Sequence, residues 1–78
     1  MRFPYKCISG YCDSTYGSNI EGASEYGAEA CSNDYPKCKA YVYSSTYGTG
    51  RLCSSVQSNG TNLDYQTCVQ IQGNIDFL

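Results

Sequence analysis

Six cysteines carry the most distinctive chemistry in this sequence of 78 residues. They stand at Cys7, Cys12, Cys31, Cys38, Cys53 and Cys68. Zinc sites favour cysteine pairs two to four residues apart, often with histidine, but the pairs here are wider and the sequence contains no histidine. An even number of cysteines at this density is typical of an oxidised extracellular scaffold, so we expect only disulfides and no free thiol. Spacing alone leaves fifteen pairings open.

Carboxylates are the next groups with catalytic potential. Without histidine, the chain lacks the ordinary general base near neutral pH and any Ser-His or Cys-His nucleophile. Glu21, Glu25 and Glu29 are spaced by four, so they would line one face of a helix, and paired carboxylates can cleave glycosidic bonds. We favour the simpler interpretation, a solvated acidic stripe. Asp13, Asp34 or Asp64 could bind calcium, but no loop carries the ligand pattern of an EF-hand. We therefore expect a protein that is not an enzyme and binds no metal or cofactor.

Nine tyrosines and no tryptophan are the most unusual feature of the composition. A tyrosine offers a flat apolar face and a hydroxyl at low entropic cost, which suits binding surfaces. We expect Tyr41 and Tyr43 to share one strand face with Lys39 beside them. Tyr47 lies in the adjacent loop, near Arg51. We predict that these five residues bind a glycan or a partner protein. The alternative is that tyrosines replace Phe and Leu in a small core.

The charge balance narrows the range of partners. The net charge is −2, and the five basic residues are scattered, which argues against nucleic acid. Lys37, Lys39 and Arg51 would form at most a local basic spot for sulfated glycans, and the acidic balance favours a solvated surface instead. No apolar run approaches the roughly 18 residues of a membrane span. The expected partners are therefore glycans or extracellular proteins.

The length predicts one disulfide-stapled extracellular domain over residues 1–78. A chain of this size buries only about 60% of its unfolded surface, so such domains usually need covalent staples. Asn59-Gly60-Thr61 is an N-glycosylation acceptor, which agrees with a secreted or cell-surface protein. Because no signal-peptide pattern follows Met1, we expect that a secreted protein with this sequence is either a mature chain or a chain to which Met1 was added.

The clearest helix candidate covers residues 24–31. Ser24 is a plausible N-cap, and Glu25 adds a negative charge to the first turn, where it suits the helix dipole. Gly27 costs about 1 kcal/mol relative to alanine. Pro36 and the polar residues before it would end the helix.

The clearest strand candidate covers residues 37–44, because tyrosine and valine alternate there with a period of two. Cys38, Ala40 and Val42 fall on one face, and their small size beside a cysteine suggests that this face meets the helix. Further strands are expected at 3–8, 51–56 and 67–72, with turns or loops at 9–10, 13–19, 45–50 and 57–62. The predicted fold is a small disulfide-rich α+β domain, with one α-helix on a short antiparallel β-sheet.

Residues 24–56 resemble the core of a PAN/apple domain. The helix ends in AEACSND, the strand reads CKAYVY, and RLCSSV follows a loop of Gly, Ser and Thr. The resemblance implies an extracellular recognition module that contacts proteins or carbohydrates and has no catalytic residues. Gly27 departs from the pattern, because the family usually has a cysteine there, and Cys12 would replace it. The resemblance thereby implies the disulfides Cys7–Cys68, Cys12–Cys53 and Cys31–Cys38.

Two other functions fit the composition. A structural subunit of an extracellular filament or coat is one, because low charge and many Tyr, Ser and Gly residues suit subunit packing, and edge strands can add to one another. A small secreted toxin, effector or pheromone is the other, since such proteins share this size and cysteine count.

Overall fold

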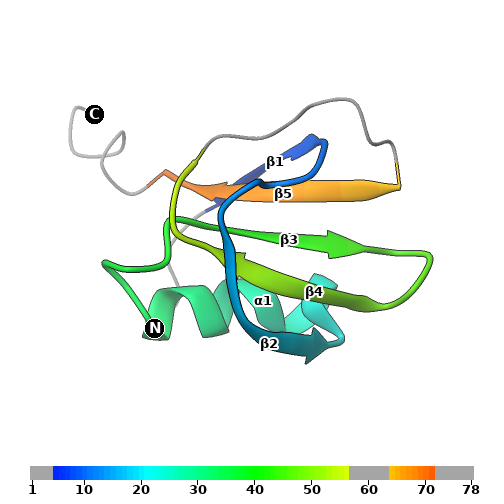
Figure 1. Cartoon of the computed structure of the whole chain (residues 1–78), viewed down its shortest axis with the longest axis horizontal. Coiled ribbons are helices and arrows are strands. Elements are labelled where there is room, and N and C mark those ends of the chain that lie inside the picture. The colour runs from blue at the N-terminus through cyan, green and yellow to red at the C-terminus, as the bar shows by residue number, and fades with distance from the viewer. Residues whose placement is uncertain (1–4, 57–63, 72–78) are drawn as a thin grey trace.

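In the part of the chain that the structure describes, five antiparallel strands form one sheet, and a single helix packs on one of its faces (Figure 1). The structure is a computed structural model that describes residues 5–56 and 64–71. The strand order is β1-β5-β3-β4-β2, so β3 is central. The elements are β1 Tyr5–Ser9, β2 Thr15–Glu21, α1 Ala23–Asn33, β3 Ala40–Ser44, β4 Thr49–Cys53 and β5 Tyr65–Gln70. The prediction of a small α+β domain with one helix on an antiparallel sheet is confirmed.

Helix α1 begins differently from the prediction. The N-cap is Gly22, in a left-handed conformation with φ of 69° that glycine adopts without strain. The Gly22 carbonyl accepts hydrogen bonds from the backbone N–H groups of Glu25 and Tyr26, at 2.8 and 2.9 Å. The prediction of Ser24 as the N-cap is therefore wrong, because Ser24 lies inside the helix.

The strand missed by the sequence interpretation is β2, since residues 13–19 were expected to be a loop. Thr15–Glu21 reads TYGSNIE, and its Gly, Ser and Asn are typical of turns. The two ends of β2 pair with β4, at Tyr16↔Leu52 and Ile20↔Gly50, and the register shifts between them. β2 is thus an edge strand with an irregular middle. The other strands lie close to their predicted positions, and Asn59 falls outside the described residues.

The segment between β1 and β2, residues 10–14, crosses the whole sheet. β1 and β2 occupy opposite edges, about four strand spacings or 19 Å apart. Figure 1 shows the segment turning at the end of β1 and then running over the sheet to β2. Gly10 N–H donates to the Tyr65 carbonyl at 3.0 Å, and Cys12 is bonded to Cys53 in β4. We call residues 10–14 the strap.

The strap and α1 cover opposite faces of the sheet. We call the face under α1 the helix face and the other the open face. The helix-face core contains Ala28, Cys31, Cys38, Tyr41 and Cys68. The open-face core contains Cys12, Ala40, Val42 and Cys53.

The expectation that Ala40 and Val42 face the helix is wrong. Tyr41 lies on the helix face instead, and α1 receives its ring with the small residues Gly27 and Ala28. A Cβ atom on Gly27 would overlap the Tyr41 ring. The helix, not the strand, therefore supplies the small side chains at this contact.

Three disulfides connect these layers. They join Cys7 to Cys68, Cys12 to Cys53 and Cys31 to Cys38, the pairs that the resemblance implied. Their sequence separations are 61, 41 and 7 residues. In the chain-entropy model, loops of these lengths correspond to about 4, 4 and 2 kcal/mol of stabilisation. Of the longer two bridges, Cys7–Cys68 fixes β1 to β5 with Cys68 in the helix-face core, and Cys12–Cys53 fixes the strap to β4 on the open face.

Candidate binding site

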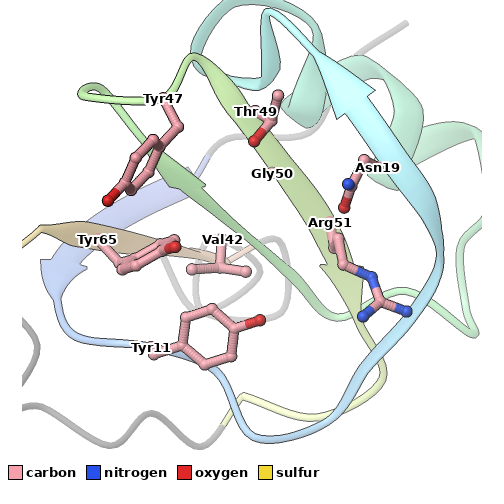
Figure 2. Close-up of a pocket in the computed structure, with 8 residues that line it drawn as sticks. All are labelled: Tyr11, Asn19, Val42, Tyr47, Thr49, Gly50, Arg51 and Tyr65. Carbon is pink, nitrogen blue, oxygen red and sulfur yellow. The ribbon is translucent and has the colours of Figure 1, made fainter.

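A pocket of about 360 Å³ opens on the part of the open face that the strap leaves uncovered. Val42, which is 1% exposed, lies at its centre. Figure 2 shows Tyr47 and Tyr65 on one side of Val42, and Asn19 and Arg51 on the other. The lining residues are Tyr11, Asn19, Val42, Tyr47, Thr49, Gly50, Arg51 and Tyr65.

Tyr47 is presented by the tight turn between β3 and β4. The Ser44 side-chain oxygen accepts a hydrogen bond from the Tyr47 N–H at 3.2 Å, and the Ser44 carbonyl accepts one from Gly48 at 2.8 Å. Gly48 has a positive φ of 74°, which the turn requires. Gly48 in turn accepts a hydrogen bond from Gly22 at 2.8 Å, which ties the turn to the start of α1. The Tyr47 side chain is 68% exposed, so a fixed backbone holds an accessible ring.

Tyr65 and Tyr11 form the second aromatic wall. Their rings meet edge to face, with centroids 4.9 Å apart, a favourable geometry for aromatic pairs. Their backbones are held together because Gly10, beside Tyr11, donates to the Tyr65 carbonyl. The Thr67 hydroxyl adds a buried hydrogen bond to the Gly10 carbonyl at 2.9 Å.

Arg51 is the charged side chain of the lining. Its Nε and one terminal nitrogen donate to the Gly17 carbonyl at 3.2 and 2.8 Å. Gly17 lies in the irregular middle of β2, with a φ of 78°. The bulge therefore turns a backbone carbonyl toward Arg51 and fixes the guanidinium beside the pocket.

The structure brings together two of the five predicted binding residues, Tyr47 and Arg51. The grouping of the other three with them is wrong. Tyr41 is only 6% exposed, and Tyr43 stacks on it, with ring centroids 6.2 Å apart, on the helix face. Lys39 places its ammonium 5.1 Å from the ring centroid of Tyr35. Alternation along β3 separates these side chains from the pocket.

The three basic residues considered for sulfated glycans make different contacts. Lys37 places its ammonium 4.5 Å from the ring centroid of Tyr16, which packs against the helix-face core. Lys37 and Lys39 thus each contact a different tyrosine, while Arg51 binds the Gly17 carbonyl.

The sequence interpretation missed four polar or aromatic lining residues. Thr49 could have been predicted from the sequence, because it lies two positions before Arg51 in β4 and therefore on the same face of the sheet. Tyr65, Tyr11 and Asn19 come from three distant segments, and only the tertiary fold brings them together.

Two tyrosines of the helix face have shifted pKa values. Burial raises the pKa of Tyr16, and its hydrogen bond to the Asp34 carboxylate and the charge of that carboxylate raise it further. Burial also raises the pKa of Tyr5, although its hydrogen bond to Ser32 at 3.0 Å acts in the opposite direction.

The acidic stripe is divided between two elements. Glu21 belongs to β2, whereas Glu25 and Glu29 are exposed on α1. Within residues 5–56 and 64–71, no three Cys, Asp or Glu side chains gather as a metal site. The helix found in those residues is too short and too polar to span a membrane.

No family model, curated protein or solved structure matches this chain. The fold and the pocket themselves therefore carry the functional argument.

Proposed function

We propose that this domain is an extracellular, non-catalytic recognition module of the PAN/apple type, and that it binds a carbohydrate in the tyrosine-lined pocket. The observation that carries this proposal is a pocket with three tyrosines around Val42, on the face opposite α1. Its volume of about 360 Å³ lies at the small end of the roughly 300–1,000 Å³ usual for small-molecule sites. A space of this size suits one or two sugar rings.

The chemistry of the lining supports a sugar ligand. The negative face of an aromatic ring attracts the weakly positive C–H groups on the apolar side of a sugar. Tyrosine hydroxyls, the Thr49 hydroxyl and the Asn19 amide offer donors and acceptors for sugar hydroxyls. The combination of apolar faces and several neutral polar groups therefore matches a polyhydroxylated ring.

The rigidity of the site supports binding without a large entropic cost. Hydrogen bonds on both sides of Tyr47 fix its turn, and the edge-to-face contact with Tyr11 restrains Tyr65. A site that is already ordered loses less conformational entropy when the ligand binds. The disulfide Cys12–Cys53 holds the strap, and with it Tyr11, over the sheet.

The three disulfides support an extracellular location, because oxidising compartments preserve such bonds. The PAN/apple assignment rests on the cysteine pattern and on Cys31–Cys38, which joins the last turns of α1 to the start of β3. The binding proposal rests on the pocket and does not require that family.

Strand addition gives little support to the alternative of a filament subunit. A filament of this kind needs two edges that accept a neighbouring strand. β1 pairs with β5 in a regular register over all five of its residues, but β2 is interrupted between Tyr16 and Ile20. One regular edge favours at most a pair of chains.

A glycan array and two matched variants test the proposal. Tyr47→Ala should weaken binding to the glycans that the unaltered protein binds by roughly tenfold, the low end of the effect of removing an aromatic ring that stacks on a nucleobase, about 1–3 kcal/mol. Tyr26→Ala is the control, since Tyr26 is 57% exposed on α1 and lies outside the pocket. Equal effects of the two variants, or binding to no glycan, would reject the proposed site.

A further inference from the structure

We propose that the pocket selects an acidic sugar, with the sugar ring against the tyrosines and its carboxylate on the guanidinium of Arg51. This inference rests on the proposed function, because it names the class of carbohydrate bound at the same site. In this proposal, the pocket lining has an aromatic side and a cationic side.

The first argument is the unbalanced charge of the lining. Arg51 contributes one positive charge to the pocket, and no lining residue is acidic. Among residues 5–56 and 64–71, no carboxylate forms an ion pair with Arg51. The chain as a whole carries a net charge of −2, so the sign of the charge in the pocket is opposite to that of the whole chain. A ligand with a negative charge would balance it.

The second argument is the geometry of the guanidinium. Its contact with the Gly17 carbonyl uses Nε–H and one terminal N–H, out of five donors in all. The two terminal nitrogens keep the remaining N–H groups. One N–H from each of these two nitrogens forms a planar pair of donors that fits the two oxygens of a carboxylate. The Gly17 contact therefore orients the guanidinium without occupying the donors that a carboxylate needs.

The third argument is the arrangement of the two sides. Tyr47 and Tyr65 lie across Val42 from Arg51 and Asn19 (Figure 2). A ligand over Val42 thus meets aromatic rings at one end and the guanidinium at the other. A uronic acid has this form, because its carboxylate projects from the rim of a ring whose faces carry C–H groups.

The neutral polar lining favours a sugar over an acidic peptide. Thr49 and Asn19 add side-chain groups near Arg51 that suit hydroxyls around a carboxylate-bearing ring. A peptide bound along a sheet would instead need a free strand edge, whereas the pocket lies on the face of the sheet, over β3 and β4.

The test is a titration of the isotopically labelled protein, followed by NMR, which detects weak binding. The probes are trigalacturonate, its fully methyl-esterified form and the neutral galactose trisaccharide. We expect trigalacturonate to bind roughly tenfold more tightly than the other two, because hydrogen bonds to a charged group are the stronger ones. Raising the salt concentration should weaken only the binding of trigalacturonate. A sulfated galactose trisaccharide and a Glu-rich peptide are further probes, and each should bind more weakly than trigalacturonate.

Two variants locate the effect. Arg51→Gln should reduce trigalacturonate binding to the level at which the same variant binds the neutral sugar. Tyr47→Ala should weaken all three saccharides. Because Arg51 also braces β2, the spectrum of Arg51→Gln must first show a folded chain. If that variant does not fold, the ester and salt comparisons on the unaltered protein still decide the question.

The outcomes separate this inference from the proposed function. Equal binding of acid, ester and neutral sugar, all weakened by Tyr47→Ala, would overturn acid selection and keep the carbohydrate site. Stronger binding of the sulfated sugar or of the peptide would overturn the choice of a carboxylate sugar. Binding of no saccharide at all would overturn both proposals.

Discussion

The two faces of the sheet use the same residue type in opposite ways. On the helix face, Tyr41 is 6% exposed and lies against Gly27 of α1. On the open face, Tyr47 is 68% exposed at the rim of a pocket. Both lie on or beside β3, six positions apart. The partner opposite each ring, a small-residue helix or open space, decides whether the tyrosine stabilises the fold or is available to a ligand.

This difference shows where stability and recognition reside in a domain with few aliphatic residues. The helix face contains the stacked rings of Tyr41 and Tyr43, and Tyr5 meets Tyr41 edge to face at 5.3 Å. On the open face, the strap packs where the other face has a helix, and the strap covers only part of this face. The uncovered remainder, over Val42, is the candidate site.

The strongest test of this comparison is a pair of alanine substitutions. Tyr41→Ala should lower the free energy of unfolding by about 3 kcal/mol, the low end for removing a buried aromatic ring. Tyr47→Ala should change it by less than about 0.5 kcal/mol, as surface substitutions usually do. Thermal unfolding with the disulfides intact measures both, at roughly 4–8 °C per kcal/mol. Similar losses in the two variants would show that the faces do not differ as described.

The sequence predicted which elements make up the fold better than it predicted which side chains lie on each face of the sheet. The cysteine count, the helix signals in residues 24–31 and the alternation in residues 37–44 were enough to predict a helix on an antiparallel, disulfide-bonded sheet. The face toward the helix was assigned wrongly, because small residues in a strand do not reveal that α1 contains smaller ones. The Gly27 position, which departs from the PAN/apple pattern, is the residue that admits the Tyr41 ring.

The binding site was predictable only in part, for a physical reason. Tyr47 and Arg51 are near each other along the chain, so a local pattern could select them. Tyr11 and Tyr65 are brought together by the Gly10–Tyr65 hydrogen bond, a contact between distant segments that no local pattern reports. β2 was missed since its role depends on Arg51 binding the Gly17 carbonyl, rather than on its own hydrophobic residues.

A smaller effect is expected at the helix side of the same contact. In Gly27→Ala, the new methyl group would overlap the Tyr41 ring and must displace it or the helix. Overpacking of this kind costs about 1–3 kcal/mol, and the gain in helix propensity of about 1 kcal/mol offsets part of it. We expect a net loss of about 1 kcal/mol in chemical denaturation, with unchanged ligand binding. Ser24→Ala, at an exposed position of α1, is the control. A stabilised Gly27→Ala protein would contradict close packing at this point.

The smallest expected effect concerns tyrosine hydroxyls of the helix face in alkali. The pKa of Tyr16 is raised by burial, and then by its hydrogen bond to Asp34 and by the charge of that carboxylate, above the ordinary value of 10.0. A raised pKa means that the folded state holds this proton more tightly than the unfolded state. The resulting stability is present in full below pH 10.0 and is lost as the pH rises from there toward the folded pKa.

Stability should therefore fall above about pH 10, and Tyr16→Phe should make the fall less steep. Asp34→Asn should act in the same direction, because it removes the neighbouring charge, whereas Asp13→Asn in the strap is the control. Denaturant unfolding between pH 8 and about 11 measures the slope. Tyr5 adds to the fall in every variant, since burial also raises its pKa. An equal slope in Tyr16→Phe and the unaltered protein would mean that Tyr16 has the same pKa in the folded and unfolded states. Its contact with Asp34 would then not contribute to the loss of stability at high pH.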